Sequence, residues 1–265
     1  MAKFEDYANK YRTVRMERRN GILLMTLHTG GGTLQWADLP YVEFPRAFAD
    51  IGSDPENKVV IMTGAGDMFS GPHAVPSIRP KKTVRGWYKE YWGGKRILMN
   101  LLDIEVPMIA AINGPALRHC EIPLLCDIVL GSESVVFQDT AHYNNGLVPG
   151  DGMHIVMPLL LGMNRGRYFL YMGQAIAAKQ ALELGMISEV LPQKDLLPRA
   201  WAIAEELAKR PPLVARFSRA ILTQHLKRMI HDSLGYGLAL EGMAVVDGWE
   251  NADPSEIELD EPRKS

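Results

Sequence analysis

Two histidines and a carboxylate come close together in the sequence FQDTAHYNNGLVPGDGMH, which spans residues 137–154. His142 and Asp151 lie on either side of a loop that ends in Val-Pro-Gly-Asp-Gly, and His154 follows it. An imidazole, with its unperturbed pKa of about 6.5, suits a general base, and a carboxylate bonded to its second ring nitrogen fixes the tautomer. The glycines that flank Asp151 would let the turn bring its carboxylate back towards His142. The sequence therefore predicts a His142–Asp151 pair that activates water.

The same three side chains could instead hold zinc, because two imidazole nitrogens and one carboxylate oxygen are suitable ligands. We find no fourth ligand at a typical spacing, and an imidazole base needs no metal ion to activate water. The sequence therefore predicts neither a metal nor another cofactor. Most histidines in α/β proteins have a structural or surface role, and for His142 the neighbouring Asp151 favours catalysis.

A second candidate, His119, lies in the segment AAINGPALRHCEIPLLCDIVLGSES, residues 110–134. An expected strand ends at Asn113-Gly114, a short helix begins near His119, and the next strand begins at Asp127. The loops at such strand ends and the helix N-termini that follow them direct amide N–H groups outward and favour negative charge. His119 is therefore placed to donate a hydrogen bond to a developing oxyanion.

Short apolar runs bounded by Gly, Pro or Ser alternate with helical patterns along most of the chain. The runs are typical of strands covered on both faces and lie at 58–64, 106–114, 127–134, 135–139 and 187–192. The helical patterns lie at about 41–51, 85–102, 154–161, 165–172 and 177–184. Before them, Asn20-Gly21 joins the two strands of an expected hairpin. This alternation predicts an α/β domain with crossover connections.

From Leu196 onward the sequence is almost purely helical. We expect three helices, the second beginning at Pro211-Pro212 and separated from the third by Gly235 and Gly237. The predicted organisation has three parts: an α/β core at 1–195, a C-terminal helical module at 196–248 and a mobile acidic tail at 249–265.

The composition excludes several classes of function. The chain has 265 residues, of which 47% are hydrophobic and 23% charged, with a formal net charge of -2. A nucleic-acid partner is not expected without a basic stripe, and no apolar run approaches the length of about 20 residues that spans a membrane. The N-terminal residues resemble neither a signal peptide nor a transit peptide. The spacing of Cys120 and Cys126 suits no disulfide framework or zinc site, so we expect buried thiols and a cytoplasmic location.

The segment VPMIAAINGPALRHCEIPLLCDIVLGSESVVF resembles the strongest signature of the crotonase (enoyl-CoA hydratase/isomerase) superfamily. KVVIMTGAGDMFSGPHAV, GLVPGDGMHIVMPLLLG and AKQALELGMISEVLP resemble further segments of that superfamily, in the right order, over about residues 11–247. The resemblance implies a crotonase-like spiral of ββα units with a C-terminal helical trimerisation module. It also implies a homotrimer or a dimer of trimers.

The sequence departs from the ordinary coenzyme A members at their oxyanion loops. Where those members have a glycine-rich loop that donates a backbone N–H to the thioester oxygen, this chain reads Pro-Ala-Leu-Arg-His. The other oxyanion loop carries Pro72, which has no N–H to donate. Of the two glutamates that a hydratase uses, the first is retained as Glu121 and the second position holds His142. These departures argue against thioester chemistry.

The same departures resemble the β-diketone hydrolase branch, which includes 6-oxocamphor hydrolase. GPALRHCEIP, FQDTAHYNNGLVPGDG and NRGRYFL match that branch closely. The resemblance implies a site made of Trp36, His119, His142, Asp151 and Glu241. The dyad would activate water, His119 and the Trp36 indole N–H would donate to the carbonyl or enolate oxygen, and Glu241 would orient a group or return a proton.

The expected reaction is cleavage of a carbon–carbon bond in a small, non-activated and cyclic 1,3-diketone. Water adds to one carbonyl, and retro-Claisen fragmentation gives a keto acid without a cofactor. The branch's histidine after its tryptophan falls near Tyr41 here, which alters the expected substrate pocket. Two alternatives stay open: a hydratase or isomerase that acts on an acyl-CoA thioester, whose phosphate could meet the basic residues 79–82, and a non-catalytic crotonase-like scaffold.

Overall fold

The computed structural model describes residues 2–71 and 83–247, and six of the strands in these ranges form one sheet. In spatial order the sheet contains β1 (Val14–Arg19), β2 (Ile22–Leu27), β3 (Val59–Gly64), β4 (Met108–Ile112), β5 (Ile128–Ser132) and β8 (Glu189–Leu191). β1 is antiparallel to β2, and every other neighbouring pair is parallel. The expected α/β arrangement is confirmed. A second, antiparallel pair joins β6 (Val136–Phe137) to β7 (Ile176–Ala177), and β7 was not expected.

The hairpin between β1 and β2 forms where the Asn-Gly pair predicted it. Asn20 and Gly21 have φ values of 53° and 82°, which is the left-handed conformation that a two-residue hairpin turn requires. The register pairs Arg19 with Ile22 directly across this turn.

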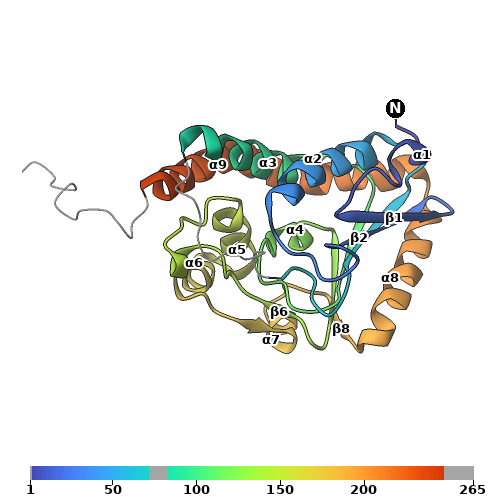
Figure 1. Cartoon of the computed structure of the whole chain (residues 1–265). Coiled ribbons are helices and arrows are strands. Elements are labelled where there is room, and N and C mark those ends of the chain that lie inside the picture. The colour runs from blue at the N-terminus through green and yellow to red at the C-terminus, as the bar shows by residue number, and fades with distance from the viewer. Residues whose placement is uncertain (1, 72–82, 248–265) are drawn as a thin grey trace, which may run out of the picture.

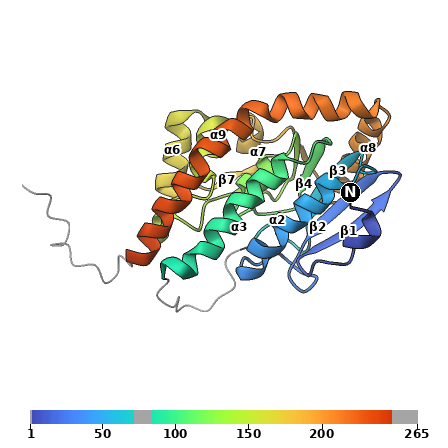
Figure 2. The same ribbon diagram turned by 90° about the horizontal axis from the view of Figure 1, so that it is seen from above.

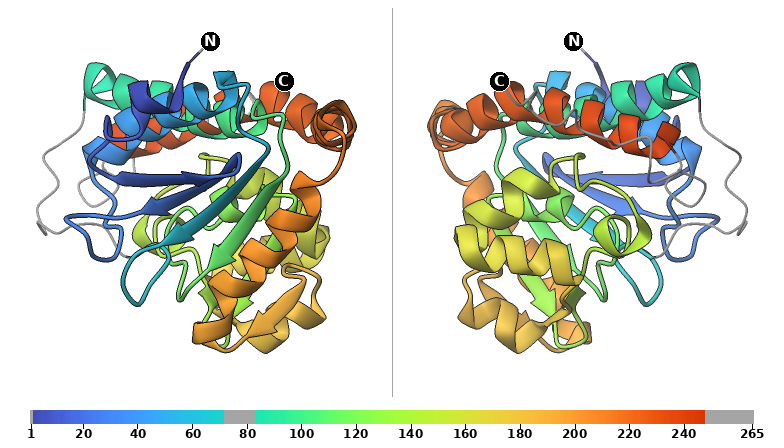
Figure 3. Two further views of the ribbon diagram at one scale, coloured as in Figure 1. Left: turned by 90° about the vertical axis from the view of Figure 1, so that its right-hand side faces the viewer. Right: turned by 90° about the vertical axis from the view of Figure 1, so that its left-hand side faces the viewer.

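Helices cover the sheet on both sides (Figure 1). α2 (Asp38–Ser53), α3 (Val84–Leu102) and α9 (Pro212–Asp247) lie side by side over one side, as Figure 2 shows. α8 (Gln193–Ala208), drawn in orange, runs along the opposite side in Figure 3. The shorter helices are α1 (Phe4–Tyr7), α4 (Glu121–Leu124), η1 (Tyr143–Asn145), α5 (Met153–Leu161), α6 (Met163–Met172) and α7 (Ala178–Glu183).

The central strands are continuously apolar in sequence because helices cover both faces of the sheet. In β3, Val59 and Ile61 join a cluster with Leu196 and Ala200 of α8, whereas the alternate residues of the strand join the larger cluster on the other face. Successive side chains of a strand point to opposite faces, so a strand buried on both faces has no polar positions. The two cysteines are buried and free, as expected.

The C-terminal helices differ from the expected three. Residues 212–247 form one helix, α9, which bends but is not interrupted (Figure 2). The two glycines expected to end a helix are instead inside it. A Cβ atom at Gly237 would lie 2.5 Å from the Gly150 carbonyl oxygen, and one at Gly150 would lie 2.1 Å from the Gly237 oxygen. Gly237 therefore lets α9 approach the 146–152 loop closely, at a helix-propensity cost of about 1 kcal/mol.

Several expectations concern residues that the structure does not describe. Pro72, the basic residues 79–82 and the acidic tail at 249–265 lie outside the described ranges. The three-part organisation stays a prediction. Within the described ranges, no helix combines the length and apolarity that crossing a bilayer requires.

Candidate active site

His142 is held by a carboxylate that sequence reasoning missed. Its Nδ1 lies 2.8 and 2.9 Å from the two carboxylate oxygens of Asp139. Asp139 also accepts from the backbone N–H of Ala141 at 3.0 Å, so the carboxylate is fixed by the turn that follows β6. Because an ionised carboxylate only accepts, Nδ1 carries the proton and Nε2 of a neutral imidazole is left to accept. The Asp-x-x-His spacing was the available signal.

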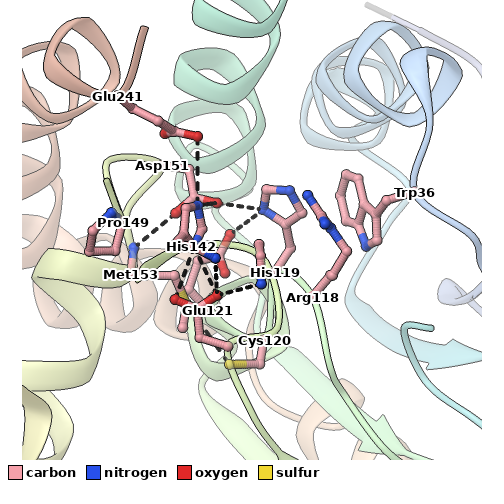
Figure 4. A network of polar contacts seen from close by, with 12 residues as sticks. Trp36, Arg118, His119, Cys120, Glu121, His142, Pro149, Asp151, Met153 and Glu241 are labelled. Atoms are coloured by element: carbon pink, nitrogen blue, oxygen red, sulfur yellow. Dashed lines mark hydrogen bonds and ion pairs between the residues drawn. The ribbon is translucent and has the colours of Figure 1, made fainter. Parts of the chain in front are cut away.

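Asp151 and Glu241 meet the other nitrogen of the same ring (Figure 4). His142 Nε2 is 3.3 Å from Asp151 Oδ2 and 3.6 Å from Glu241 Oε1. The expected contact of His142 with Asp151 is thus present, but on Nε2, and Asp139 is the carboxylate that meets Nδ1. Both acids near Nε2 are buried.

The close approach of α9 to the 146–152 loop explains how Glu241 reaches His142. Glu241 follows Gly237 by four residues and therefore lies on the same face of the helix. A Cβ atom at Gly150 would lie 3.0 Å from the Glu241 Cβ atom. Gly150 and Gly237 together bring Asp151 and Glu241 to one side of the imidazole.

His119 shares Asp151 with His142. His119 Nδ1 lies 2.9 Å from Glu121 Oε1 and 3.1 Å from Asp151 Oδ2, and its Nε2 lies 2.8 Å from the Tyr41 hydroxyl. Its φ of 51° is a left-handed conformation that favours glycine and strains a bulky residue. With this backbone conformation, the His119 imidazole, two residues before α4, lies inside the cluster.

Trp36 adjoins the cluster through its ring. The indole centroid lies 3.9 Å from that of His119. Its N–H donates to Ser70 Oγ at 2.7 Å, and Ser70 in turn donates to the backbone oxygen of Arg118. The N–H expected to reach a substrate oxygen is therefore already used, and Trp36 contributes an apolar surface.

His154 lies outside the cluster. Its Nδ1 is 2.9 Å from the carbonyl oxygen of Pro149, and its ring packs against α9 at Gly237. The group of His142, Asp151 and His154 considered for zinc is not assembled. Among the described residues, His119, Glu121 and Asp151 could present three ligand atoms within 4.8 Å of one another. Their shortest contacts are ordinary hydrogen-bond distances.

Burial and mutual charge shift the protonation of these groups strongly. Burial would lower the pKa of His142, but the charge of Asp151 and hydrogen bonds to three carboxylates raise it well above its usual value. Burial opposes ionisation of Asp151 as well, yet the two histidines hold its pKa below the normal range. Burial raises the pKa of Glu121 to about 7 and that of Glu241 in the same direction. The protonation of these groups is therefore coupled, and the pKa of Glu121 lies near neutral pH.

Comparison with known proteins places the chain in a family. Residues 17–248 match the family model described as enoyl-CoA hydratase/isomerase. The chain belongs to the enoyl-CoA hydratase/isomerase family. The fold expected from the crotonase resemblance is thereby confirmed.

A short-chain-enoyl-CoA hydratase from Clostridium acetobutylicum is 28% identical over 73% of this chain and 74% of the relative. A probable peroxisomal enoyl-CoA hydratase from Arabidopsis thaliana is 28% identical over 83% of this chain and 80% of the relative.

A solved family member is much more similar. The β-diketone hydrolase from the cyanobacterium Anabaena sp. PCC 7120, bound to (S)-3-oxocyclohexyl acetic acid, is 50% identical with a TM-score of 0.89. The alignment covers 91% of this chain and 97% of that chain. An enoyl-CoA hydratase/isomerase from Mycobacterium paratuberculosis is 25% identical, covers 90% and 95%, and has a TM-score of 0.83. The resemblance to the β-diketone hydrolase branch is confirmed.

Proposed function

We propose that the protein hydrolyses a carbon–carbon bond of a cyclic, non-activated 1,3-diketone and releases a keto acid. The observation that carries this proposal is the buried imidazole of His142, held by Asp139 at Nδ1 and facing Asp151 and Glu241 at Nε2. In its neutral form this imidazole can take a proton from water at Nε2, and the acids beside it can orient that water and hold the proton.

The reaction has two steps in this proposal. First, water loses a proton to His142 Nε2 while its oxygen bonds to one carbonyl carbon, giving a tetrahedral alkoxide. The alkoxide then reforms its carbonyl, and the bond to the central carbon breaks. The electron pair of that bond passes into the enolate of the second carbonyl. A proton from His142 or Glu241 returns to the central carbon, and the product is a keto acid.

The loop that carries His119 supports a diketone rather than a thioester as the substrate. Where the resemblance expects backbone N–H groups for a thioester oxygen, His119 occupies a left-handed position and extends an imidazole into the cluster. The 50% identity to a protein described as a β-diketone hydrolase, with a bound keto acid, also supports the proposal. The two enoyl-CoA hydratases compared by sequence are each only 28% identical to this chain.

The deciding experiment offers the purified protein a panel of neutral cyclic 1,3-diketones and, separately, crotonyl-CoA. We expect keto acids, detected by NMR, from at least one diketone without added metal. His142→Ala should lower kcat by about 10²–10⁴-fold, the range for loss of a general base. The matched control is His225→Ala, which changes an exposed histidine of α9 and should leave kcat unchanged. Hydration of crotonyl-CoA with no diketone cleaved would overturn the proposal, and inertness towards both would favour the scaffold.

We also propose the homotrimer, or dimer of trimers, implied by the family resemblance, and a cytoplasmic location. The exposed apolar side chains of α9 support the oligomer, since Phe217, Ile221 and Leu222 are 58%, 75% and 77% exposed in the single chain. Light scattering coupled to gel filtration should give at least three times the chain mass. A monomer would remove this part of the proposal.

A further inference from the structure

Arg118 is a buried cation whose side chain has no partner among the described residues. It lies in the loop between β4 and α4 and is 8% exposed, and its Nε is buried without a hydrogen bond. None of its guanidinium nitrogens donates to, or pairs with, any residue that the structure describes. Arg219 is buried too, but it donates to the Ile104 carbonyl oxygen and pairs with Asp127. A buried guanidinium left unpaired is costly, so an external partner is indicated.

The backbone of Arg118 is fixed even though its side chain is unpaired. Its carbonyl oxygen accepts from Ser70, which itself accepts from the Trp36 indole N–H. Figure 4 draws the guanidinium beside Trp36 and His119, on the opposite side of His119 from His142. Its charge also acts on Tyr41, whose ring is tilted against Trp36 and meets His119 edge to face. The free N–H groups of Arg118 therefore lie at the end of the site formed by Trp36 and Tyr41, which we call the Trp36 end.

The proposed reaction needs a donor at that end. Carbon–carbon cleavage places negative charge on the second carbonyl oxygen, away from the carbonyl that His142 hydrates. The two donors expected there are engaged: Ser70 takes the Trp36 N–H, and the Tyr41 hydroxyl occupies Nε2 of His119. The nearby acids gather around the two histidines, and none of them pairs with Arg118.

We propose that Arg118 is a catalytic residue that donates hydrogen bonds to the enolate oxygen formed as the carbon–carbon bond breaks. This inference rests on the proposed diketone hydrolysis. The bond between the hydrated carbon and the central carbon breaks, and its electron pair spreads over the central carbon and the second oxygen. Arg118 stays protonated throughout, and the central carbon takes its proton from the histidine side. The substrate must then carry a second, neutral carbonyl that reaches the Trp36 end, which a monoketone lacks.

The test compares wild-type protein with Arg118→Met on the neutral diketone that the wild type cleaves best. Removal of one donor to a developing oxyanion costs about 10²–10³-fold in rate, and we expect that loss in kcat with little change in KM. Arg118→Lys, which keeps a cation but not the forked geometry, should retain part of the activity. The matched control is Arg210→Met, just after α8 on the surface, with unchanged kcat.

Two further readouts separate catalysis from a structural role. Added guanidinium should restore activity to Arg118→Ala, and the loss in Arg118→Met should shrink for diketones whose leaving enolate is less basic. Because Arg118→Met removes an unpaired buried cation, it should melt at or above the temperature of the wild type. Where the methionine variant does not fold, Arg118→Lys carries the test, and the enolate series is measured on it.

Each other outcome overturns the inference in a recognisable way. An unchanged kcat in Arg118→Met removes Arg118 from the reaction and leaves the proposed function intact. A rise in KM or in the product inhibition constant without loss of kcat assigns Arg118 to carboxylate binding instead. A wild type that cleaves no diketone of the panel overturns the proposed function, and this inference falls with it.

Discussion

Replacing two glycines of α9, Gly235 and Gly237, by alanine, one at a time, tests how the helix is held against the site. Both changes raise helix propensity by about 1 kcal/mol, so the difference between the variants isolates the close contact. At Gly235 the nearest atom to a new Cβ is the Tyr91 hydroxyl at 3.4 Å, an ordinary contact. At Gly237 the new Cβ would lie 2.4 Å from His154 Cε1 and 2.5 Å from the Gly150 oxygen.

The magnitude follows from these distances. Cβ contacts below 3.0 Å are essentially not found, so α9 and the 146–152 loop must separate by at least about half an ångström in Gly237→Ala. Overpacking of this kind costs about 1–3 kcal/mol, whereas Gly235→Ala should gain up to about 1 kcal/mol. For a chain of this size each kcal/mol shifts Tm by about 2–4 °C.

Activity provides the second readout. Separation would carry Glu241 away from His142 Nε2, from which it is 3.6 Å distant. A misplacement of about 1 Å can cost up to about 10²-fold in kcat, so Gly237→Ala should lose activity while Gly235→Ala keeps it. Differential scanning calorimetry and the diketone assay measure both effects. Equal Tm values and equal kcat values for the two variants would show that Gly237 is not needed for close packing.

Four other expectations concern the charged cluster. Asp139→Asn should lower kcat by about 10²–10³-fold, because an amide no longer stabilises the imidazolium of His142; full activity would assign orientation to another group. If His142 is the base, kcat/KM should keep rising as pH increases above 6, since its raised pKa keeps it protonated there; a plateau already at pH 6 would contradict this. The same shift stabilises the fold below about pH 6.5 and is lost as pH rises through the raised pKa, so His142→Ala should be most destabilising in acid. Dialysis against EDTA should leave kcat unchanged, whereas activity restored only by Zn²⁺ would place a metal at Asp151 and its neighbours.

The elements whose residues follow a simple periodicity were predictable from the sequence. β3 is a short apolar run because both of its faces are buried, and the Asn20-Gly21 turn needs left-handed backbone at both positions. The predicted division of residues 212–247 into two helices was wrong, because here local propensity does not decide the structure. Local propensity makes Gly235 and Gly237 look like helix ends, but packing against the 146–152 loop outweighs that propensity.

Which residues gather at the site was more predictable from the sequence than how their side chains are arranged. His142 and Asp151 were found as a pair, but which ring nitrogen meets which acid depends on the side-chain directions that the turn after β6 imposes. Asp139 was missed because its Asp-x-x-His spacing lies in a loop, where no regular periodicity shows that the two side chains meet. The bond from Trp36 to Ser70 joins residues 34 positions apart, and only the fold reveals it.

The mixture of raised and lowered pKa values in the cluster has a calorimetric consequence. Glu121, with a pKa of about 7, and Glu241, whose pKa is also raised, are buried in the cluster. A ligand that brings negative charge beside them should raise both pKa values further and draw a proton from the buffer as it binds. The heat of binding measured in phosphate should then differ from that measured in Tris by an amount proportional to the protons taken up. The protein would thus report the occupancy of its site through the ionisation enthalpy of the solution around it.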